Sequence, residues 1–309
     1  MTSRLRRLGY RLVGRWFDYI LHLRPAEWPI MAGHTALGYL LAVGLDGARH
    51  AEALGPALLA LGLWVILLNG GTLALNSAFD RDEGDIGYLR SPPPVPRGLG
   101  LVSLGMMVAG QLLAFRLPPM FRWTYALCLL LSLAYSVPPL RLKAVAGADW
   151  VINMWGFGTL TPYAGYAATG RPLDGARALV LLAFCPLFAS LYPLTQLYQF
   201  EEDRQRGDRT LALILGMRRS LLIAILAALV AFAMLATAGL LAGWGASAGD
   251  LLRWAGLGLA GGLWCRVLVP WLVGYDRMTM AEHQAGMYAA LRAWAVTDVV
   301  VILGWGVYS

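Results

Sequence analysis

The stretch LNSAFDRDEGDIGYLRSPPPVPRG, residues 75–98, begins where the apolar run GPALLALGLWVILLNGGTLAL, residues 55–75, ends. The run is long enough to cross a bilayer as a helix. Four carboxylates follow it at once: Asp80, Asp82, Glu83 and Asp85. The orientation of a membrane helix depends on lysine and arginine and little on acids. A cluster of acids at this helix end therefore indicates a functional site at a membrane boundary.

The composition is that of a membrane protein. Of the 309 residues, 58% are hydrophobic and 14% are charged, and the mean hydropathy is +0.59. Soluble domains carry about 25% charged residues. We expect an all-α protein with nine transmembrane helices in a single domain, residues 1–309, and no nucleic-acid partner. The predicted spans are 25–45, 55–79, 99–116, 122–136, 148–168, 176–200, 219–242, 251–273 and 288–308.

The first 23 residues are rich in arginine and do not form a signal peptide, because no short apolar stretch with a cleavage site follows. Four arginines recur every three or four residues and so share a helical face: Arg4, Arg7, Arg11 and Arg15. Apolar residues occupy other positions on the helical wheel: Leu5, Leu8, Leu12 and Trp16. Residues 1–23 are predicted to form a basic interfacial helix on an anionic leaflet. A frayed basic tail is the alternative.

Basic residues are distributed unevenly between the two sides of the predicted bundle. The side of the N-terminus carries Arg4, Arg6, Arg7, Arg11, Arg15, Arg24, Arg81, Arg90, Arg97, Arg141, Lys143, Arg204, Arg206, Arg209, Arg218, Arg219, Arg277 and Arg292. The other side carries only Arg49, Arg116, Arg122, Arg171, Arg177 and Arg253. The positive-inside rule then places the N-terminus, and the loops on its side, in the cytoplasm of a cell inner or plasma membrane.

A second acidic cluster repeats the first. It follows the predicted sixth helix and consists of Glu201, Glu202, Asp203 and Asp208. Asn76 and Asp80 are four residues apart, as are Gln199 and Asp203, so each pair shares one helix face. Mg²⁺ prefers such oxygen ligands and is usually shared between a few carboxylates and phosphate oxygens. The pattern predicts a Mg²⁺ site for a phosphorylated ligand. Solvated loops with internal ion pairs are the alternative.

A phosphorylated ligand also needs cations, and the same loops contain Arg90, Arg141, Lys143, Arg204 and Arg209. Lys143 is the only lysine among 25 basic residues. It lies at the end of AYSVPPLRLKA, residues 134–144, beyond a Pro-Pro turn that ends the predicted fourth helix. Lysine acts as a compact point charge on phosphate. We therefore expect Lys143 to bind the ligand; a positive-inside anchor is the alternative.

These motifs resemble the UbiA superfamily of intramembrane prenyltransferases. The family carries N-x-x-x-D-x-x-x-D after helix 2, YSxPPxRLK after helix 4, D-x-x-x-D after helix 6 and RP…W at helix 1. Here these positions hold Asn76-x-x-x-Asp80, YSVPPLRLK from Tyr135, Gln199-x-x-x-Asp203 before RQRGDRTLALILG, and LRPAEWP with Arg24. The motifs extend from residue 24 to about residue 216. The resemblance implies nine helices around a central lipophilic chamber.

The resemblance also implies roles for individual residues, with two departures. The third acid of the first motif would fall on Gly84, so Asp85 or Glu83 takes its place, and the second motif begins with Gln199. The implied metal ligands are Asn76, Asp80, Asp85, Gln199 and Asp203. Substrate binding is implied for Arg24, Asn76, Tyr135, Arg141, Lys143, Gln199 and Arg209, and catalysis for Asp80, Asp85, Asp203 and Lys143. The number of Mg²⁺ ions stays open.

The implied reaction is the Mg²⁺-dependent transfer of an isoprenoid chain from its diphosphate to a lipophilic, aromatic or similar acceptor. Ionisation of the allylic C–O bond needs a dry chamber, because water would quench the cation. Aromatic faces stabilise a cation, and the predicted fifth and sixth spans contain Trp150, Trp155, Tyr163, Tyr166, Tyr192 and Tyr198. Asp85 or Glu83 could remove the final proton.

Two other functions stay open on the sequence alone. A terpene cyclase on the same scaffold would trap the cation with the double bonds of the substrate itself. A transporter with broken helices would place its charges at the midplane, whereas the charges here gather at one mouth. Two ionisable residues lie inside predicted spans, His34 and Asp298. Such residues indicate function by default, and an interhelical hydrogen bond is the alternative.

Overall fold

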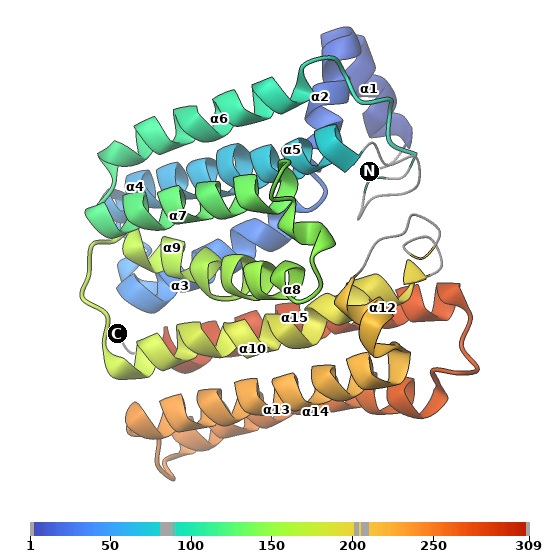
Figure 1. Cartoon of the computed structure of the whole chain (residues 1–309). Helices are drawn as coiled ribbons and strands as arrows, with labels where there is room; N and C mark the ends of the chain where they lie inside the picture. The colour runs from blue at the N-terminus through green and yellow to red at the C-terminus, as the bar shows by residue number, and fades with distance from the viewer. Residues whose placement is uncertain (1–2, 81–88, 90, 201–203, 205–209, 307–309) are drawn as a thin grey trace.

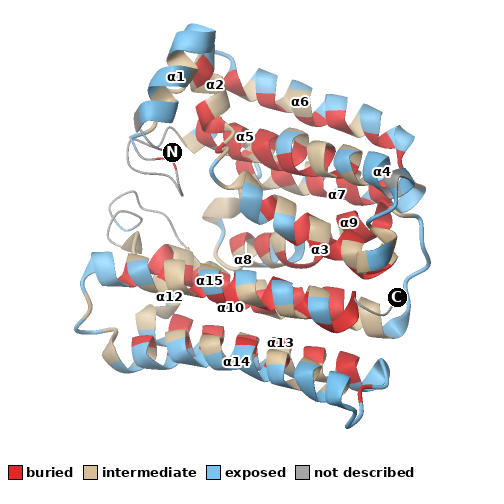
Figure 2. Cartoon of the chain, turned by 180° about the vertical axis from the view of Figure 1, so that it is seen from behind, coloured by how far each residue is buried: buried red, intermediate tan, exposed pale blue. Residues whose placement is uncertain are grey.

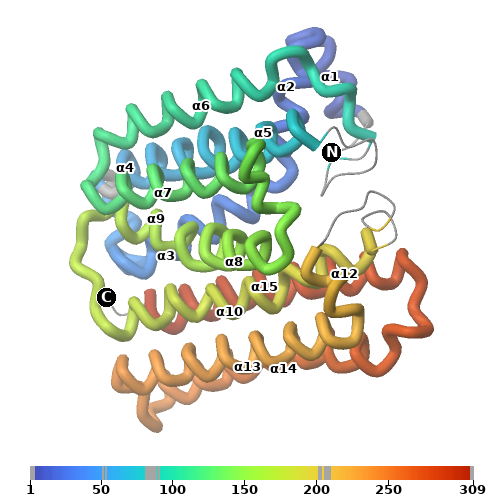
Figure 3. Tube along the Cα trace, viewed as in Figure 1, coloured from blue at the N-terminus to red at the C-terminus, as the bar shows by residue number. Residues whose placement is uncertain are grey.

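The computed structural model describes the whole chain except residues 1–2, 81–88, 90, 201–203, 205–209 and 307–309. The described residues form helices and no β-strand, which confirms the predicted all-α class. In Figure 1 the long helices run side by side along one direction. The first described helix, near the N-terminus, and the carboxyl end of the last helix lie at opposite ends of the bundle (Figure 3).

The helices follow the order of the predicted spans. The amino-terminal half contains α1 (Ser3–Val13), η1 (Gly14–Trp16), α2 (Phe17–His22), α3 (Trp28–Gly47), α4 (Ala51–Leu61), η2 (Gly62–Gly70), α5 (Gly71–Asp80), α6 (Leu99–Leu113), η3 (Ala114–Arg116) and α7 (Pro119–Ser136). The carboxyl-terminal half contains η4 (Leu142–Ala144), α8 (Ala148–Asn153), η5 (Met154–Leu160), α9 (Thr161–Ala167), α10 (Gly175–Leu197), α12 (Leu211–Leu215), α13 (Met217–Leu241), α14 (Ala248–Gly274) and α15 (Met280–Trp305).

Seven helical stretches of the described chain are long and apolar enough to cross a bilayer: Trp28–Gly47, Leu54–Asp80, Leu99–Arg116, Gly175–Leu197, Met217–Leu241, Ala248–Gly274 and Met280–Trp305. The other two predicted spans are also helical, as α7 and as the continuous rod α8–η5–α9. The protein is therefore an integral membrane protein, and the total of nine crossings stays a prediction.

The outward faces of the helices are apolar, as expected for a surface that meets lipid. Leu101 on α6 and Val273 on α14 are 78% and 79% exposed. Figure 2 shows the complementary pattern, with buried residues on the helix faces that point into the bundle. Inside, one apolar core joins α3 to α10 and α13–α15, and a second joins α4–α7 to α9. The amino-terminal and carboxyl-terminal halves thus each have their own core.

Two glycines allow α3 and α9 to cross in close backbone contact at the boundary between these cores. A Cβ on Gly38 would overlap the carbonyl oxygen of Pro162, and a Cβ on Gly165 would overlap that of Thr35. Only glycine fits at such a close approach. His34 also lies at this boundary, where Nδ1 is 3.1 Å from Asp298 Oδ1. This contact agrees with the alternative given for these two intramembrane residues, an interhelical hydrogen bond.

The basic N-terminal segment is helical, as α1, η1 and α2. Its predicted apolar face is exposed: Leu5 is 55% exposed, Leu12 73% and Trp16 62%. Phe17 and Leu21 are buried instead and pack with Leu89. A helix with exposed leucines next to exposed arginines suits a membrane surface, and the interfacial location of residues 1–23 stays a prediction.

The second and fifth predicted spans each contain a π-helical segment, η2 and η5. An α-helix has 3.6 residues per turn, so residues four apart drift gradually around it. The wider π turn, with its i→i+5 hydrogen bonds, offsets this drift. Both segments therefore keep a four-residue spacing on one face. That face forms part of the cavity described next.

Candidate active site

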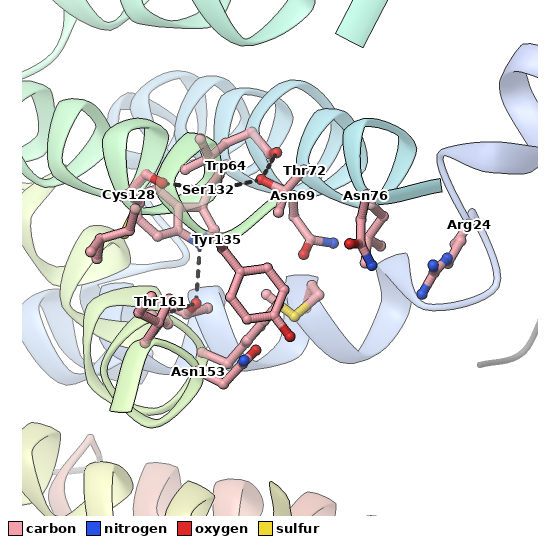
Figure 4. A pocket seen from close by; sticks show the side chains of 17 residues that line it. Arg24, Trp64, Asn69, Thr72, Asn76, Cys128, Ser132, Tyr135, Asn153 and Thr161 are labelled. Carbon is pink, nitrogen blue, oxygen red and sulfur yellow. Dashed lines mark hydrogen bonds between the residues drawn. The ribbon is translucent and has the colours of Figure 1, made fainter. Parts of the chain in front are cut away.

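A cavity of about 210 Å³ lies between the first helices and the α8–η5–α9 rod (Figure 4). Residues from α3, η2, α5, α7, α8, η5 and α9 line it, together with Arg24. Its apolar walls are made by Met31, Leu68, Leu73, Cys128, Leu131 and Ile152. Aromatic walls are made by Trp64, Tyr135 and Phe157. The cavity is thus a mainly apolar chamber between the amino-terminal helices and the α8–η5–α9 rod.

The four-residue spacing of η2 and α5 builds one wall of this chamber. Trp64, Leu68, Thr72 and Asn76 all line it, and Asp80 ends the same row. The row begins with an indole deep in the chamber and ends with a carboxylate beyond its edge. Along this helix face, the side chains therefore change from apolar inside the chamber to acidic at the end of α5.

A charged cluster lies at the α5 end of the chamber. Lys143 Nζ forms an ion pair with Asp80 Oδ1 and donates a hydrogen bond to Asn76 Oδ1 at 3.4 Å. Arg141 Nη2 is 3.5 Å from the same carboxylate oxygen. The Asp80 side chain is only 7% exposed. Asp80 from one predicted motif and Arg141 and Lys143 from another thus meet at one point.

Arg141 and Lys143 both lie in the segment that follows α7. Its Arg141 has a φ of 36°, in the left-handed region that non-glycine residues rarely occupy. The chain then continues as η4, which contains Lys143. Strained backbone of this kind persists when surrounding contacts hold it and often occurs at functional sites. Here the turn directs both side chains back towards the end of α5.

Arg24 lies beside Asn76 at the edge of the same cavity (Figure 4). Its side chain is buried and pairs with Glu27, with 3.9 Å between Nη1 and Oε1. Within the described chain, its Nε and Nη2 have no hydrogen-bond partner. Burial lowers the pKa of the neighbouring His22, so this histidine is neutral near pH 7. Arg24 therefore offers two free N–H donors to an anion.

Neutral polar groups line the chamber further in. The hydroxyl oxygens of Thr72 and Ser132 are 2.8 Å apart, so one hydroxyl donates to the other, and the accepting hydroxyl donates to a carbonyl of its own helix. Trp64 Nε1 donates to Thr161 Oγ1 at 3.3 Å. Asn69 is buried, and its Nδ2 has no partner among the described residues. An unpaired buried donor costs about 1–3 kcal/mol, which a ligand oxygen could offset.

A second buried carboxylate, Asp149, lies behind Tyr135. Its Oδ1 accepts from the backbone N–H of Gly147 at 2.9 Å. Its Oδ2 accepts from Gln196 Nε2 at 3.0 Å and from the Tyr192 hydroxyl at 3.4 Å. Tyr192 in turn is 3.2 Å from the hydroxyl of Tyr135. This network joins α7, α8 and α10.

Comparison with known proteins identifies the family. Residues 28–277, more than half of the chain, match the UbiA prenyltransferase family. This chain belongs to the UbiA prenyltransferase family. It is an enzyme of the prenyltransferase class, and the resemblance drawn from the sequence motifs is confirmed.

Curated relatives are similar over most of the chain. A digeranylgeranylglyceryl phosphate synthase from Natronomonas pharaonis is 28% identical over 294 residues, 91% of this chain and 96% of the relative. A lycopene elongase/hydratase from Haloferax volcanii is 28% identical over 219 residues, 69% of this chain and 68% of the relative.

Solved structures share the fold. A UbiA homolog from Archaeoglobus fulgidus bound to DMAPP and Mg²⁺ has a TM-score of 0.66 at 18% identity, with 91% of this chain and 99% of that chain covered. A digeranylgeranylglyceryl phosphate synthase has a TM-score of 0.68 at 13% identity, with 94% of this chain and 98% of that chain covered. At these identities the matches show a common UbiA fold.

The structure brings most of the predicted UbiA site residues together. Arg24, Asn76 and Tyr135 line the cavity, and Asp80, Arg141 and Lys143 cluster at its α5 end. Gln199 follows the end of α10 and does not line the cavity. The remaining predicted site residues, Asp85, Asp203 and Arg209, lie outside the described residues, as does Glu83. The ends of α5 and α10 lie at the same end of the bundle (Figure 1).

The aromatic residues of the predicted fifth and sixth spans were candidates for the chamber lining, with packing or an interfacial belt as the favoured alternative. None of Trp150, Trp155, Tyr163, Tyr166, Tyr192 and Tyr198 lines this cavity. Trp155 is 41% exposed, Trp150 donates to the carbonyl of Ala189, and Tyr166 donates to that of Pro172. Membership of a helix does not fix which of its faces points inward, so the sequence alone could not place these rings in the chamber. The lining aromatics are Trp64, Tyr135 and Phe157.

The donor atoms of the site suit a divalent cation as far as the structure describes them. Asn76 and Asp80 present an amide and a carboxylate oxygen from one helix face. The positively charged side chains of Arg141 and Lys143 already contact the Asp80 carboxylate. Within the described ranges, no group of three acids, histidines or cysteines is placed to hold a metal. A complete ligand set therefore needs residues beyond these two.

Proposed function

We propose that this UbiA enzyme transfers the prenyl group of a prenyl diphosphate to a lipophilic acceptor, with Mg²⁺ as its cofactor. The observation that carries this proposal is the convergence of Asn76, Asp80, Arg141 and Lys143 at one end of an apolar chamber, with Arg24 at its edge. A diphosphate needs charge and a prenyl tail needs an apolar wall, and the two environments adjoin here.

The cations at the mouth would bind the diphosphate. Lys143 is a compact point charge, and Arg24 has two N–H groups free for a phosphate. Fixed donors of this kind stabilise the negative charge that develops on a leaving group. Arg141, and by sequence Arg209, would add to this field. The bound pyrophosphate would replace Asp80 as the main partner of Lys143.

Asn76 and Asp80 would hold Mg²⁺, with Asp85, Gln199 and Asp203 as the further ligands predicted from the sequence. When bound, Mg²⁺ neutralises charge on phosphate oxygens and so favours departure of pyrophosphate. The UbiA homolog from Archaeoglobus fulgidus is bound to DMAPP and Mg²⁺ together, which supports this cofactor.

The chamber would protect the prenyl cation. Its walls of Leu68, Leu131 and Ile152 exclude water, which would otherwise quench the cation. The ring faces of Trp64, Tyr135 and Phe157 would stabilise positive charge through their quadrupoles. Formation of a cation is part of the proposal, and this lining supports it.

The acceptor would be a lipophilic molecule with an oxygen function. Asn69, Thr72 and Ser132 offer neutral hydrogen bonds inside the chamber, which suits a hydroxyl or carbonyl group. An aromatic acceptor is the expectation from the sequence. The relatives named for glyceryl phosphate products make a glyceryl phosphate lipid the second class to test. We further propose that the N-terminus and the active-site mouth face the cytoplasm, from the arginine bias.

A product screen tests the function directly. The purified protein would receive geranyl, farnesyl or geranylgeranyl diphosphate, with Mg²⁺ or with EDTA, and aromatic or glyceryl phosphate acceptors, followed by mass spectrometry. We expect a prenylated acceptor only with Mg²⁺. A cyclic hydrocarbon or terpenol formed without any acceptor would instead support a terpene cyclase, and no consumption of any diphosphate would refute the proposal.

A further inference from the structure

The Asp149 carboxylate is fully buried, and the proposed binding of donor and acceptor does not use it. Its exposure is 0%. Its partners are the uncharged groups of Gly147, Gln196 and Tyr192, and within the described chain it forms no ion pair. Burial of an unpaired carboxylate is costly. A carboxylate in such a place indicates a role beyond packing.

Two tyrosine hydroxyls connect this carboxylate to the cavity. Tyr135 lines the cavity and lies beside Asn153 in Figure 4. Its hydroxyl is 3.2 Å from that of Tyr192, which is 3.4 Å from Asp149 Oδ2. Both separations exceed the usual O–H···O length, and catalytic hydrogen bonds are often long before the substrate is bound. The result is an unbroken row of exchangeable protons from the chamber to Asp149.

The proposed reaction releases a proton that needs an acceptor. A bond forms between the prenyl carbon and an oxygen or carbon of the acceptor, the allylic C–O bond to diphosphate breaks, and the acceptor loses one proton. We infer that Tyr135 takes this proton while its own passes to Tyr192 and that of Tyr192 passes to Asp149. Charge and atoms balance, because Asp149 ends protonated, pyrophosphate leaves with the bonding electron pair, and both tyrosines regain their protons.

The hydrogen bonds distinguish this relay from a merely structural role. Gly147 and Gln196 hold Asp149 without either tyrosine. Gln196 is itself fixed, because its Oε1 accepts from the backbone N–H of Ala212 at 3.3 Å. The link from Tyr192 is therefore not needed to hold the carboxylate in place. Asp149 acts as a positioning residue at the end of the relay, and only Tyr135 faces the substrate.

Removal of the Tyr192 hydroxyl is the decisive test, and this test rests on the proposed function. Tyr192→Phe keeps the ring and leaves the Gly147 and Gln196 bonds to Asp149. We expect kcat to fall at least tenfold with KM for the prenyl diphosphate unchanged, because a lost acid–base group typically costs about 100- to 10,000-fold. The solvent deuterium isotope effect on kcat should rise. The matched control Tyr166→Phe removes a buried hydroxyl that bonds only Pro172 O, and it should leave kcat unchanged.

A measurement without turnover separates the relay from the proposed function. The infrared band of the protonated Asp149 carboxyl would be assigned by its absence in Asp149→Asn and followed after a pH jump. The titratable groups that face this carboxylate are Tyr192 and, through it, Tyr135. We expect proton uptake to slow at least tenfold in Tyr192→Phe and not in Tyr166→Phe.

Each outcome decides one of the two claims. Equal uptake rates in Tyr192→Phe and wild type would overturn the relay, as would an unchanged kcat in an active enzyme. A wild-type enzyme that turns over no donor with any acceptor would refute the proposed function alone, and the infrared rates would still decide the relay.

Discussion

Two aspartates near the chamber, Asp80 and Asp149, have opposite surroundings. Asp80 ends α5 and contacts two cations, Lys143 and Arg141. Asp149 begins α8 and is held only by neutral donors. A carboxylate among cations stays ionised and can exchange one cation for another. A carboxylate among neutral donors can exchange protons. The difference supports the two proposed roles, with Asp80 at the Mg²⁺ and diphosphate site and Asp149 at the end of the proton relay.

The largest expected effect is that of Asp80→Asn. It keeps the shape of the side chain and removes the charge that attracts cations, so we expect kcat/KM to fall about 1,000-fold or more, in line with the loss of a preorganised electrostatic group. The dependence of the rate on Mg²⁺ concentration should weaken as well. Steady-state kinetics with a Mg²⁺ titration would measure both.

A matched control is Asp174→Asn. Asp174 also pairs with an arginine, Arg177, but at the start of α10, at the opposite end of that helix from the site. Burial opposes ionisation there, yet hydrogen bonds from Arg177 hold the pKa of Asp174 below its usual value. Its activity should stay within twofold of wild type. Near-normal activity of Asp80→Asn would remove Asp80 from the proposed metal site.

The two cations that contact Asp80 provide the next test of the comparison, and Lys143 is the more important of them. Lys143→Gln should lower kcat/KM about 100-fold, a loss typical of one fixed donor to a developing anion. Arg141→Gln should cost less, because the Arg141 side chain is 41% exposed and therefore more strongly screened by water, and that of Lys143 is 17% exposed. Kinetics of both variants with one donor would show the order, and a reversed order would contradict the assigned roles.

A smaller effect is expected at the edge of the chamber. Arg24→Gln should raise KM for the prenyl diphosphate about tenfold and change kcat little, because its free N–H groups would bind the phosphate in ground and transition states alike. A donor titration at saturating acceptor would separate KM from kcat. If KM stays constant, Arg24 does not bind the diphosphate.

The smallest effect on the reaction rate is expected at Gln196, whose variant should mainly lose stability. Gln196→Leu leaves Asp149 without its strongest neutral donor and leaves the N–H of Ala212 unpaired. We expect a loss of about 1–3 kcal/mol in stability. Thermal unfolding in detergent would measure it, with Thr195→Val as a control whose hydroxyl bonds only the carbonyl of Tyr192 in its own helix. An unchanged midpoint would show that the Asp149 network contributes little to folding.

The charged surroundings of Asp80 could be predicted from the sequence, and the neutral surroundings of Asp149 could not. Asn76, Asp80, Arg141 and Lys143 stand at helix ends in motifs where charge is conspicuous, so they could be found without coordinates. Asp149 lies in the first turn of α8, where acids are common, so nothing in the sequence singles it out. Its isolation depends on α7 and α10 packing over it, which local sequence does not reveal.

The chamber lining shows the same limit. Asn69 and Thr72 lie seven and four residues before Asn76, so their shared face was a usable signal. The inward aromatics were not predictable, because Phe157 faces the chamber and Trp155 faces outward within a single π segment. The helices themselves were predictable, since apolar length alone marks them, whereas their π segments carry no signature in composition.

The π segments η2 and η5 have a consequence for how this enzyme could diversify. Each segment holds one more residue than a regular α-helical path would need, so deletion of a single residue there would restore α-helical winding. The side chains on both sides of the deletion would keep their present directions, because the wide π turn has already absorbed the extra residue. Loss of one residue from either segment would thus change the lining only within that segment and leave residues beyond it, such as Asn76 after η2, facing the cavity.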